Sequence, residues 1–405
     1  MTLSYTFIFF EIMRILVEII LLVVFLTGCS RQQSVVRDNI KANIHVSFIP
    51  REDTVSLSSI YGRKVDILTL DSIVLASVSK VLRYDSLWIV KGKSAEGGVH
   101  LFSNKGHYLK PLLRWGQGPA EVFDIWAMKL YQDAVYLLAN AGTEVIKYSL
   151  LSQELEWRFK VPDEVLSATD FELLSDGKFV FLKSVARKPE KEYKLYVYND
   201  QKRQIEGCFL ELDKKAGDYI SFSQTDCLYR MGDKIRYYEV FRNGICQLVN
   251  GDLEGYIGFV NNKYTFPEDE LYQDSYTFET FIETCENSNY IWGHRNLYEG
   301  NRFISSSYNY RNDMYWNLID KFSNNSHSYK WVRDDLILNE TSLVEEYLSM
   351  TNVQGDCHYF TLSYYNLDRL MQQEDAGKDI MPNIAHLYKT MDDGSNDLVV
   401  CLYEK

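Results

Sequence analysis

The feature that most constrains the fold is a pair of short strand-like runs that recurs along the chain. Each unit opens at a turn residue, continues with an apolar and aromatic run, turns again, and closes on a second run. The units begin near residues 85, 133, 176, 233, 289 and 356. A spacing of roughly 40 to 50 residues with four strands per unit is typical of propeller blades. The sequence therefore predicts an all-β, six-bladed β-propeller with four-stranded antiparallel blades over residues 46–405.

Two other architectures are considered for the same pattern. A pair of β-sandwiches would not show a fixed unit repeat, and the tight coils of a β-solenoid would repeat at a shorter spacing. The later units are longer, which predicts insertions in their loops. Near the C-terminus, Asn339–Met350 and Tyr364–Glu374 carry helical apolar spacing. We expect them to be short helical insertions that pack on the propeller, rather than partner-binding helices.

The N-terminus has the composition of a secretory signal. An apolar run from Ile15 to Leu26 leads directly into Leu26-Thr27-Gly28-Cys29, after which the chain turns polar. This ending resembles the bacterial lipobox, in which the cysteine is acylated and becomes the mature N-terminus. The resemblance implies a signal peptide over residues 1–28, with Met13 a better start than Met1, and a lipid on Cys29. A buried N-terminal helix or an uncleaved anchor are the alternatives.

The segment after Cys29 predicts where the protein resides. Residues 29–45 are interpreted as a lipidated tether, with the alternating run Ile44–Phe48 as the first strand. No acidic run follows Cys29, whereas in Bacteroidetes such a run resembles a surface-export signal. We therefore expect a cell-envelope protein on the outer membrane that faces the periplasm.

Two further segments carry a family resemblance. Gly116-Gln117-Gly118-Pro119-Ala120-Glu121 resembles the Gly-x-Gly-Pro-Gly-Glu signature of the six-bladed, NHL-like β-propeller lipoproteins of Bacteroidetes, with Ala120 in place of a glycine. Ala385-His386-Leu387 and Asn396–Lys405 are similar to the closing strand of that family. The resemblance implies the propeller and the lipid anchor, but no ligand. Gly116, Gly118 and Pro119 are expected to form a structural turn, because a phosphate loop would open a helix and carry a nearby lysine.

Charge and cysteine content exclude several functions. The chain has 43 basic and 56 acidic residues, a net charge of −13, which argues against a nucleic-acid partner. Apart from Cys29, the six cysteines show no C-x-x-C spacing, and we interpret them as small buried hydrophobic residues, leaving one disulfide open. No nucleophile elbow, zinc-binding helix pair or Walker loop occurs. No cofactor and no metal are predicted.

A propeller commonly binds at the ends of its central channel, and three residues are the candidate ligand contacts there. Trp126 offers a stacking platform, and His294 and Arg295 offer polar contacts, Arg295 as a forked donor for carboxylates or sugar hydroxyls. Alternatively, Trp126 belongs to a blade core and Arg295 pairs with a surface acid.

Two functions remain open at this level. The favoured one is a non-enzymatic binding or protein-interaction scaffold for a glycan, a peptide or an envelope protein. The other is a propeller hydrolase or lyase acting on glycans or peptides, which a histidine–carboxylate cluster or a carboxylate pair in the channel would favour. A sensory module is less favoured, since the sequence shows no output domain.

Overall fold

The computed structural model describes residues 41–405 apart from 76, 94–97, 117, 119–120, 185–190, 213–225, 261, 268–275, 345–348 and 373–381. The chain divides into two units, Met1–Val35 and Val36–Lys405, and every described residue belongs to the second. The predicted signal peptide and Cys29 lie outside the described residues. Within the described residues, no helix is both long enough and apolar enough to cross a membrane.

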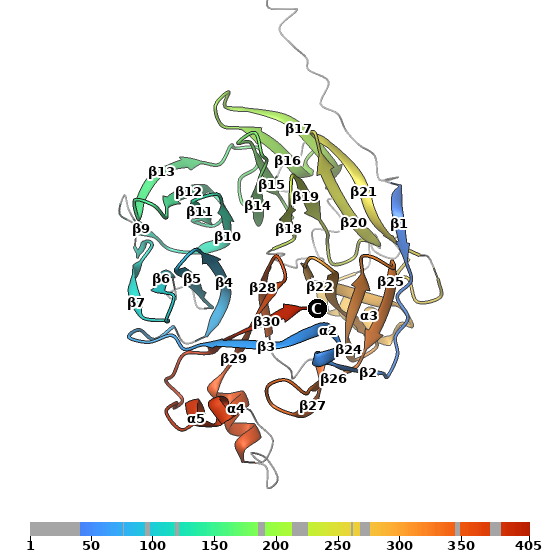
Figure 1. The fold of residues 1–405 in the computed structure, drawn as a ribbon. Helices are drawn as coiled ribbons and strands as arrows, with labels where there is room; N and C mark the ends of the chain where they lie inside the picture. Colours follow the sequence, from blue (N-terminus) through green and yellow to red (C-terminus); the bar gives the residue numbers. More distant parts are fainter. Residues whose placement is uncertain are drawn as a thin grey trace, which may run out of the picture. The chain divides into compact units, whose positions relative to one another are not determined.

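Most of the second unit consists of four-stranded antiparallel sheets arranged around a centre (Figure 1). Blade I comprises β4 (Val78–Tyr84), β5 (Leu87–Gly92), β6 (Val99–Ser103) and β7 (Tyr108–Pro111). Blade II comprises β10 (Ile125–Tyr131), β11 (Ala134–Ala139), β12 (Glu144–Ser149) and β13 (Glu154–Lys160). Blade III comprises β14 (Asp170–Leu173), β15 (Phe179–Leu182), β16 (Tyr193–Asn199) and β17 (Gln204–Glu211).

The following blades continue the ring in chain order. Blade IV comprises β18 (Leu228–Met231), β19 (Lys234–Tyr237), β20 (Gly244–Val249) and β21 (Asp252–Phe259). Blade V comprises β22 (Ile291–Glu299), β23 (Phe303–Tyr310), β24 (Asp313–Asp320) and β25 (Asn325–Tyr329). The last sheet, blade VII, comprises β28 (Ser349–Gln354), β29 (Cys357–Leu362), β30 (Leu398–Glu404) and β3 (Tyr61–Leu68). The prediction of an all-β propeller with four-stranded antiparallel blades is confirmed.

The predicted number of six blades is wrong, because a seventh sheet stands between blades V and VII. Blade VI has three short strands, β2 (Thr54–Ser56), β26 (Trp331–Asp334) and β27 (Glu340–Leu343), in the order β2-β26-β27. Its strands are too short to form a visible repeat unit, and β2 comes from the far end of the sequence. The helix predicted over Asn339–Met350 is likewise wrong, since pairing with β26 makes Glu340–Leu343 a strand.

The N-terminal strand β3 closes the ring, because it pairs antiparallel with the C-terminal strand β30. Three buried side chains, linked by hydrogen bonds, connect the strands at this closure. The Tyr61 hydroxyl lies 3.1 Å from His358 Nδ1, and His358 Nε2 lies 3.0 Å from Glu404 Oε1. Since Tyr61 is on β3, His358 on β29 and Glu404 on β30, three strands from both ends of the chain are tied together.

Further strands and helices lie in addition to the blade strands named above. Strand β1 (Ala42–Val46) overlaps the predicted first strand and adds parallel to β21, while β8 (Arg114–Trp115) and β9 (Glu121–Val122) pair with each other. The helices are α2 (Leu57–Ile60), α3 (Phe278–Asn287), α4 (Tyr364–Met371) and α5 (Pro382–Tyr388). Helix α4 confirms the described part of the predicted helix Tyr364–Glu374. Helix α3 was not predicted, although Thr277 and Thr280 form a capping box at its start.

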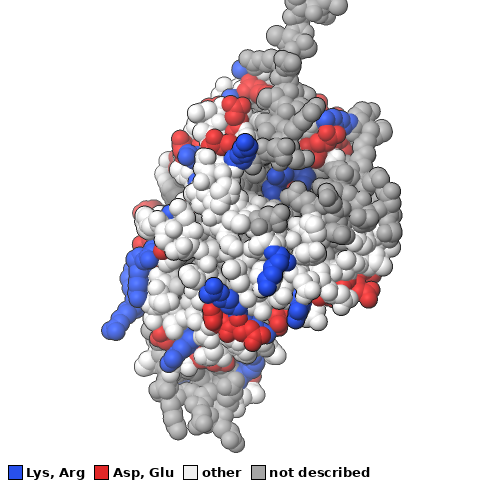
Figure 2. Space-filling view, turned by 90° about the vertical axis from the view of Figure 1, so that its right-hand side faces the viewer, with Lys and Arg blue, Asp and Glu red and all other residues white. Residues whose placement is uncertain are grey.

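The face of the molecule in Figure 2 carries small groups in which basic and acidic residues lie side by side, among wide uncharged areas. The described residues on this face therefore do not form the broad basic surface that binding to a phosphate backbone needs.

Candidate functional site

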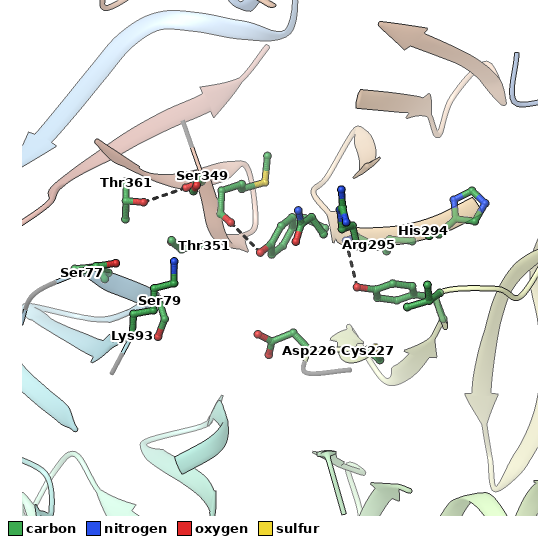
Figure 3. A pocket seen from close by; sticks show the side chains of 18 of the residues that line it. Ser77, Ser79, Lys93, Asp226, Cys227, His294, Arg295, Ser349, Thr351 and Thr361 are labelled. Atoms are coloured by element: carbon green, nitrogen blue, oxygen red, sulfur yellow. Dashed lines mark hydrogen bonds between the residues drawn. The ribbon is translucent and has the colours of Figure 1, made fainter. Parts of the chain in front are cut away.

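A cavity of about 660 Å³ lies where inner strands from several blades begin (Figure 3). Its walls come from the first residues of β4 and β28, from Asp226 and Cys227 just before β18, and from β22. We call this space the mouth cavity. Because inner strands of different blades converge on it, it stands at one end of the central channel.

The lining of the mouth cavity is mostly neutral and polar. Hydroxyl groups come from Ser77, Ser79, Ser349, Thr351, Thr361 and Ser363, and amide groups from Asn296, Asn309 and Asn366. Tyr238, Trp292 and Tyr298 add aromatic surface. Such a wall offers many hydrogen-bonding groups to a ligand and little net charge.

Several of these hydroxyls have their proton committed to the backbone. Thr351 Oγ1 donates to the Tyr359 carbonyl at 3.2 Å, Thr361 Oγ1 donates to the Ser349 carbonyl at 3.4 Å, and Ser79 Oγ lies 3.1 Å from the Lys91 and Gly92 carbonyls. A hydroxyl has one proton and two lone pairs. The oxygens can therefore still accept hydrogen bonds, and this part of the wall suits a ligand rich in donors.

The structure places both Arg295 and His294 among the residues that line the mouth cavity, but their side chains differ in exposure. Arg295 is exposed, and its Nη2 donates to Asn309 Oδ1 at 3.0 Å. Figure 3 shows the His294 ring pointing away from Arg295, and the ring lies 5.0 Å from that of Phe259 and 5.4 Å from that of Phe48. Burial lowers the pKa of His294 to about 4, so the imidazole is neutral near pH 7. The His294 side chain packs into the core beside the cavity.

Trp126 is not among the residues that line the mouth cavity. It stands on β10, is half-buried, and donates from Nε1 to Asp124 Oδ2 at 3.0 Å. Its ring packs on the hydrophobic cluster of blades II and III. The structure thus does not bring Trp126 together with Arg295. Sequence reasoning missed Tyr298 and Asn309 as individual contacts, although both fall in the tyrosine-rich stretch that follows His294.

Next to the mouth cavity lies a cluster of charged side chains that we call the neck: Lys80, Lys129, Asp170 and Asp226. Lys129 Nζ lies 3.0 Å from Asp170 Oδ1 and 3.6 Å from Asp226 Oδ1, and Lys80 Nζ also contacts Asp226. Asp226 lines both the mouth cavity and a further channel cavity of about 250 Å³. Since each residue comes from a different one of blades I to IV, the neck ties these blades together at the axis.

The two neck carboxylates have different electrostatics. Burial alone would raise the pKa of Asp226, but Lys80 and Lys129 overcome it and hold that pKa at about 2. Burial raises the pKa of Asp170 against the opposing effect of Lys129, and its Oδ2 accepts the Leu228 amide at 2.8 Å. Both carboxylates are thus occupied by lysines or backbone. Among the described residues, no group of three or more His, Cys, Asp or Glu side chains is arranged to hold a metal ion.

Of the residues between β8 and β9, the structure describes Gly116 and Gly118. The Gly116 amide donates to the Val122 carbonyl at 2.9 Å, and the Gly118 amide donates to Glu121 Oε2 at 2.8 Å. Gly116 has φ of +150°, and a Cβ there would lie 2.1 Å from Glu121 Oε2. A side chain at Gly116 would therefore displace Glu121. Pro119 lies outside the described residues.

All six cysteines beyond Cys29 are described, and they are buried and in no disulfide: Cys208, Cys227, Cys246, Cys285, Cys357 and Cys401. They act as small hydrophobic residues in the interior, as expected from the apolar runs in which they occur.

A comparison with known families decides what kind of chain this is. The model of a family described as a domain of unknown function (DUF4934) matches residues 43–403. The chain belongs to this family. The match runs from β1 to β30 and so includes the mouth cavity and the neck. Among curated proteins, none matches this sequence.

Solved structures place this DUF4934 member among propellers. A Bacteroides fragilis protein described as exported has a TM-score of 0.71 at 17% identity, with 89% of this chain and 99% of that chain covered. The extracellular domain of a one-component system from B. thetaiotaomicron has a TM-score of 0.36 at 13% identity, covering 65% of this chain and 29% of that one. At 17% identity the first similarity shows a shared fold, and the second carries no argument. For the DUF4934 member, function has to be inferred from the mouth cavity itself.

Proposed function

We propose that this protein is a non-enzymatic binding scaffold of the cell envelope, anchored by a lipid on Cys29, whose mouth cavity binds the end of a glycan. The observation that carries the proposal is the mouth cavity of about 660 Å³, walled by hydroxyls and amides with aromatic rings between them. Sugars present many hydroxyl donors and an apolar ring face, and this wall offers both acceptors and aromatic surface to them.

The charged groups around the mouth support binding rather than turnover. Arg295 lines the cavity with a guanidinium, a group whose forked donors suit sugar hydroxyls or a sugar carboxylate. Glycoside hydrolysis needs two carboxyl groups free to exchange protons or to attack. Among the described lining residues of the mouth cavity, the carboxylates are Asp226, which Lys80 and Lys129 contact, and Asp397, whose Oδ2 accepts the Val78 amide at 2.9 Å. No cofactor is part of this proposal, and the net charge of −13 argues against nucleic acid.

The location is part of the same proposal. The order of apolar run, Leu-Thr-Gly-Cys and polar tether supports lipidation at Cys29 and a place on the periplasmic side of the outer membrane. The similar fold of a B. fragilis protein described as exported agrees with an envelope location. Membership of the NHL-like propeller lipoproteins of Bacteroidetes is proposed on the same grounds. Cys29→Ala should abolish incorporation of labelled fatty acid, and labelling that persists would contradict the anchor.

Binding is tested with a panel of soluble glycans on the full chain, with affinity measured by titration calorimetry. We expect Arg295→Ala and Asn309→Ala each to weaken binding about 10-fold or more. Arg311→Ala is the matched control, since Arg311 is an exposed arginine that pairs with Asn289 and does not line the cavity. Absence of glycan binding would overturn the glycan assignment and make a peptide or envelope protein the partner. Release of cleaved sugar would favour a hydrolase or lyase.

A further inference from the structure

The channel cavity of about 250 Å³ lies farther along the inner strands than the mouth cavity does, and we call it the rear cavity. On β4 the lining changes from Ser79 in the mouth cavity to Lys80 and Leu82 in the rear cavity. On β28 it changes from residues 349–351 to residues 352–354. The inner strands β10, β14, β18 and β22, which surround the same centre in Figure 1, also line the rear cavity. The rear cavity therefore lies in the channel on the side away from the mouth.

The rear cavity is lined by charged side chains from both classes: Lys80, Lys129, Arg230, Glu172, Asp226 and Glu299. Two of its carboxylates already have cationic partners. Asp226 belongs to the neck, where two lysines contact it. Lys321 Nζ lies 2.9 Å from Glu299 Oε1, and the Tyr229 hydroxyl donates to Glu299 Oε2 at 3.0 Å. These two carboxylates are therefore poorly placed to hold a cationic ligand.

Arg230 differs from the two lysines, because it makes no hydrogen bond to any described residue. Its Nε and Nη2 are buried and without a hydrogen-bond partner, and its side chain is 18% exposed. The guanidinium lies over the Tyr131 ring, 4.5 Å from the ring centre. Nε and Nη2 form one edge of the guanidinium, and such an edge binds both oxygens of a carboxylate. Because no hydrogen bond holds Arg230, its last side-chain torsions can turn this edge toward a ligand without breaking one.

Glu172 is the acid nearest to this edge, and it does not pair with it. Its Oε1 lies 3.9 Å from Arg230 Nε, which is too long for a hydrogen bond. The same oxygen accepts the Leu173 amide at 3.0 Å. Burial raises the pKa of Glu172 against the opposing effects of Lys129 and Arg230. The protein thus brings a carboxylate close to Arg230 without using the guanidinium edge.

The charges that line the rear cavity, taken together with their ion-pair partners, contain one more cation than carboxylates. Among the described residues the cations are Lys80, Lys129, Arg230, Arg236 and Lys321, and the carboxylates are Asp170, Glu172, Asp226 and Glu299. The whole chain has the opposite sign, with a net charge of −13. A buried charge is unfavourable unless it is paired. One monovalent anion would balance this set.

We propose that the rear cavity binds a small carboxylate, which the Arg230 guanidinium holds through its Nε–Nη2 edge. This site is separate from the proposed glycan site in the mouth cavity and does not rest on it. A cavity of about 150 Å³ holds a benzene ring, so the rear cavity has room for a carboxylate of a few carbon atoms.

The site is tested by fluorine NMR on the full chain with trifluoroacetate as the probe. Trifluoroacetamide is the matched control, since it has nearly the same shape and no charge. The trifluoroacetate signal should broaden on addition of the protein, and unlabelled acetate should reverse the broadening. No broadening, or equal broadening of both probes, would overturn the carboxylate site. Neither probe contains a sugar, so the result does not depend on glycan binding at the mouth.

Two variants locate the binding at Arg230. Arg230→Met should weaken trifluoroacetate binding about 10-fold or more, because the charged fork is lost. Arg311→Met is the control, since Arg311 does not line the rear cavity, and it should leave binding unchanged. Glu172→Gln removes a negative charge 3.9 Å from the guanidinium and should strengthen binding about threefold or more.

The variants also define the results that would contradict the site. Unchanged affinity in Arg230→Met would mean that an adventitious ion only binds elsewhere on the protein. If Arg230→Met fails to fold, Glu172→Gln decides, because a merely structural role of Arg230 gives no gain in affinity. Equal or weaker binding in Glu172→Gln would overturn the site.

Discussion

The contact between blades II and III and the contact between blades V and VII show two ways of filling the space between sheets. Between blades II and III, aromatic rings close the gap, with the Phe179 ring 5.2 Å from that of Phe159 and 6.3 Å from that of Trp157. Between blades V and VII, serines face a cavity, and a three-stranded sheet fills only the outer part. The difference shows that the extra blade, rather than a special loop, creates the space next to the mouth.

We expect the largest loss of stability at the contact between blades II and III, which aromatic rings fill. Phe179 is 2% exposed and meets aromatic rings from β13, β14 and β15. Phe179→Ala should lower the free energy of unfolding by about 3 to 5 kcal/mol, because its large cavity cannot collapse. Urea denaturation measures this. Ser305→Ala at the contact between blades V and VII is the control and should cost no more than about 1 kcal/mol, because it removes only a weak contact of the hydroxyl with Met350 Sδ. Equal effects would remove the distinction between the two contacts.

A second prediction concerns the ion pair that joins blades III and IV. Lys194 Nζ lies 2.7 and 2.8 Å from the two Glu239 carboxylate oxygens, and Arg242 Nε lies 3.1 Å away. Burial alone would raise the pKa of Glu239, yet Lys194 and Arg242 lower it to about 2 from an ordinary 4.5. Glu239→Gln should lower stability at pH 7 by about 1.5 to 3 kcal/mol, since it weakens charge-assisted hydrogen bonds from two half-buried cations.

The sign of the pH dependence follows from that lowered pKa. The folded carboxylate holds its proton less tightly than the unfolded one, so its contribution is complete above pH 4.5 and is lost as the pH falls toward 2. Urea denaturation from pH 7 to pH 2 should therefore show the wild type and Glu239→Gln converging. A constant difference across this range would contradict the assignment.

Two substitutions that enlarge a buried side chain, one at each contact between blades, test the same comparison. Ala127 is 2% exposed in the hydrophobic cluster of blades II and III, whereas Ser305 lines the cavity of about 290 Å³ between blades V and VII. Ala127→Val should lower stability by about 1 to 3 kcal/mol through overpacking. Ser305→Val adds bulk beside this cavity and should stay within about 1 kcal/mol of the wild type. If thermal unfolding gives the opposite order, the cavity does not have room for the added methyl groups.

We expect the smallest loss of stability at Tyr298, which lines both the mouth cavity and the cavity between blades V and VII. Tyr298→Phe keeps the ring and removes the hydrogen bond to the Met350 carbonyl, which should cost about 1 kcal/mol of stability. Tyr315→Phe provides a tyrosine control outside both lining sets. A loss of more than about 3 kcal/mol would contradict this prediction, because a single hydrogen bond does not account for it.

Local patterns were enough to predict the ordinary blades. Short alternating runs such as Ala134–Ala139 bury apolar residues on both faces, and their spacing shows how often the chain returns to the axis. The predicted unit near residue 289 differs from the structure. It opens on the inner strand β22, whereas the unit near residue 133 opens on the second strand of its blade. Of the three predicted contacts, His294 and Arg295 line the mouth cavity, while Trp126 does not.

The sequence by itself determined the fold class, the strand-rich repeat and the acidic charge, since these depend on composition and on spacing between neighbours. Only the tertiary structure decided the seventh blade, which needs Thr54–Ser56 to pair with Trp331–Asp334 from the other end of the chain. It also decided that His294 turns into the core and that Lys129 neutralises Asp170. Such contacts join residues far apart in the chain, and no local pattern encodes which distant partner a side chain meets.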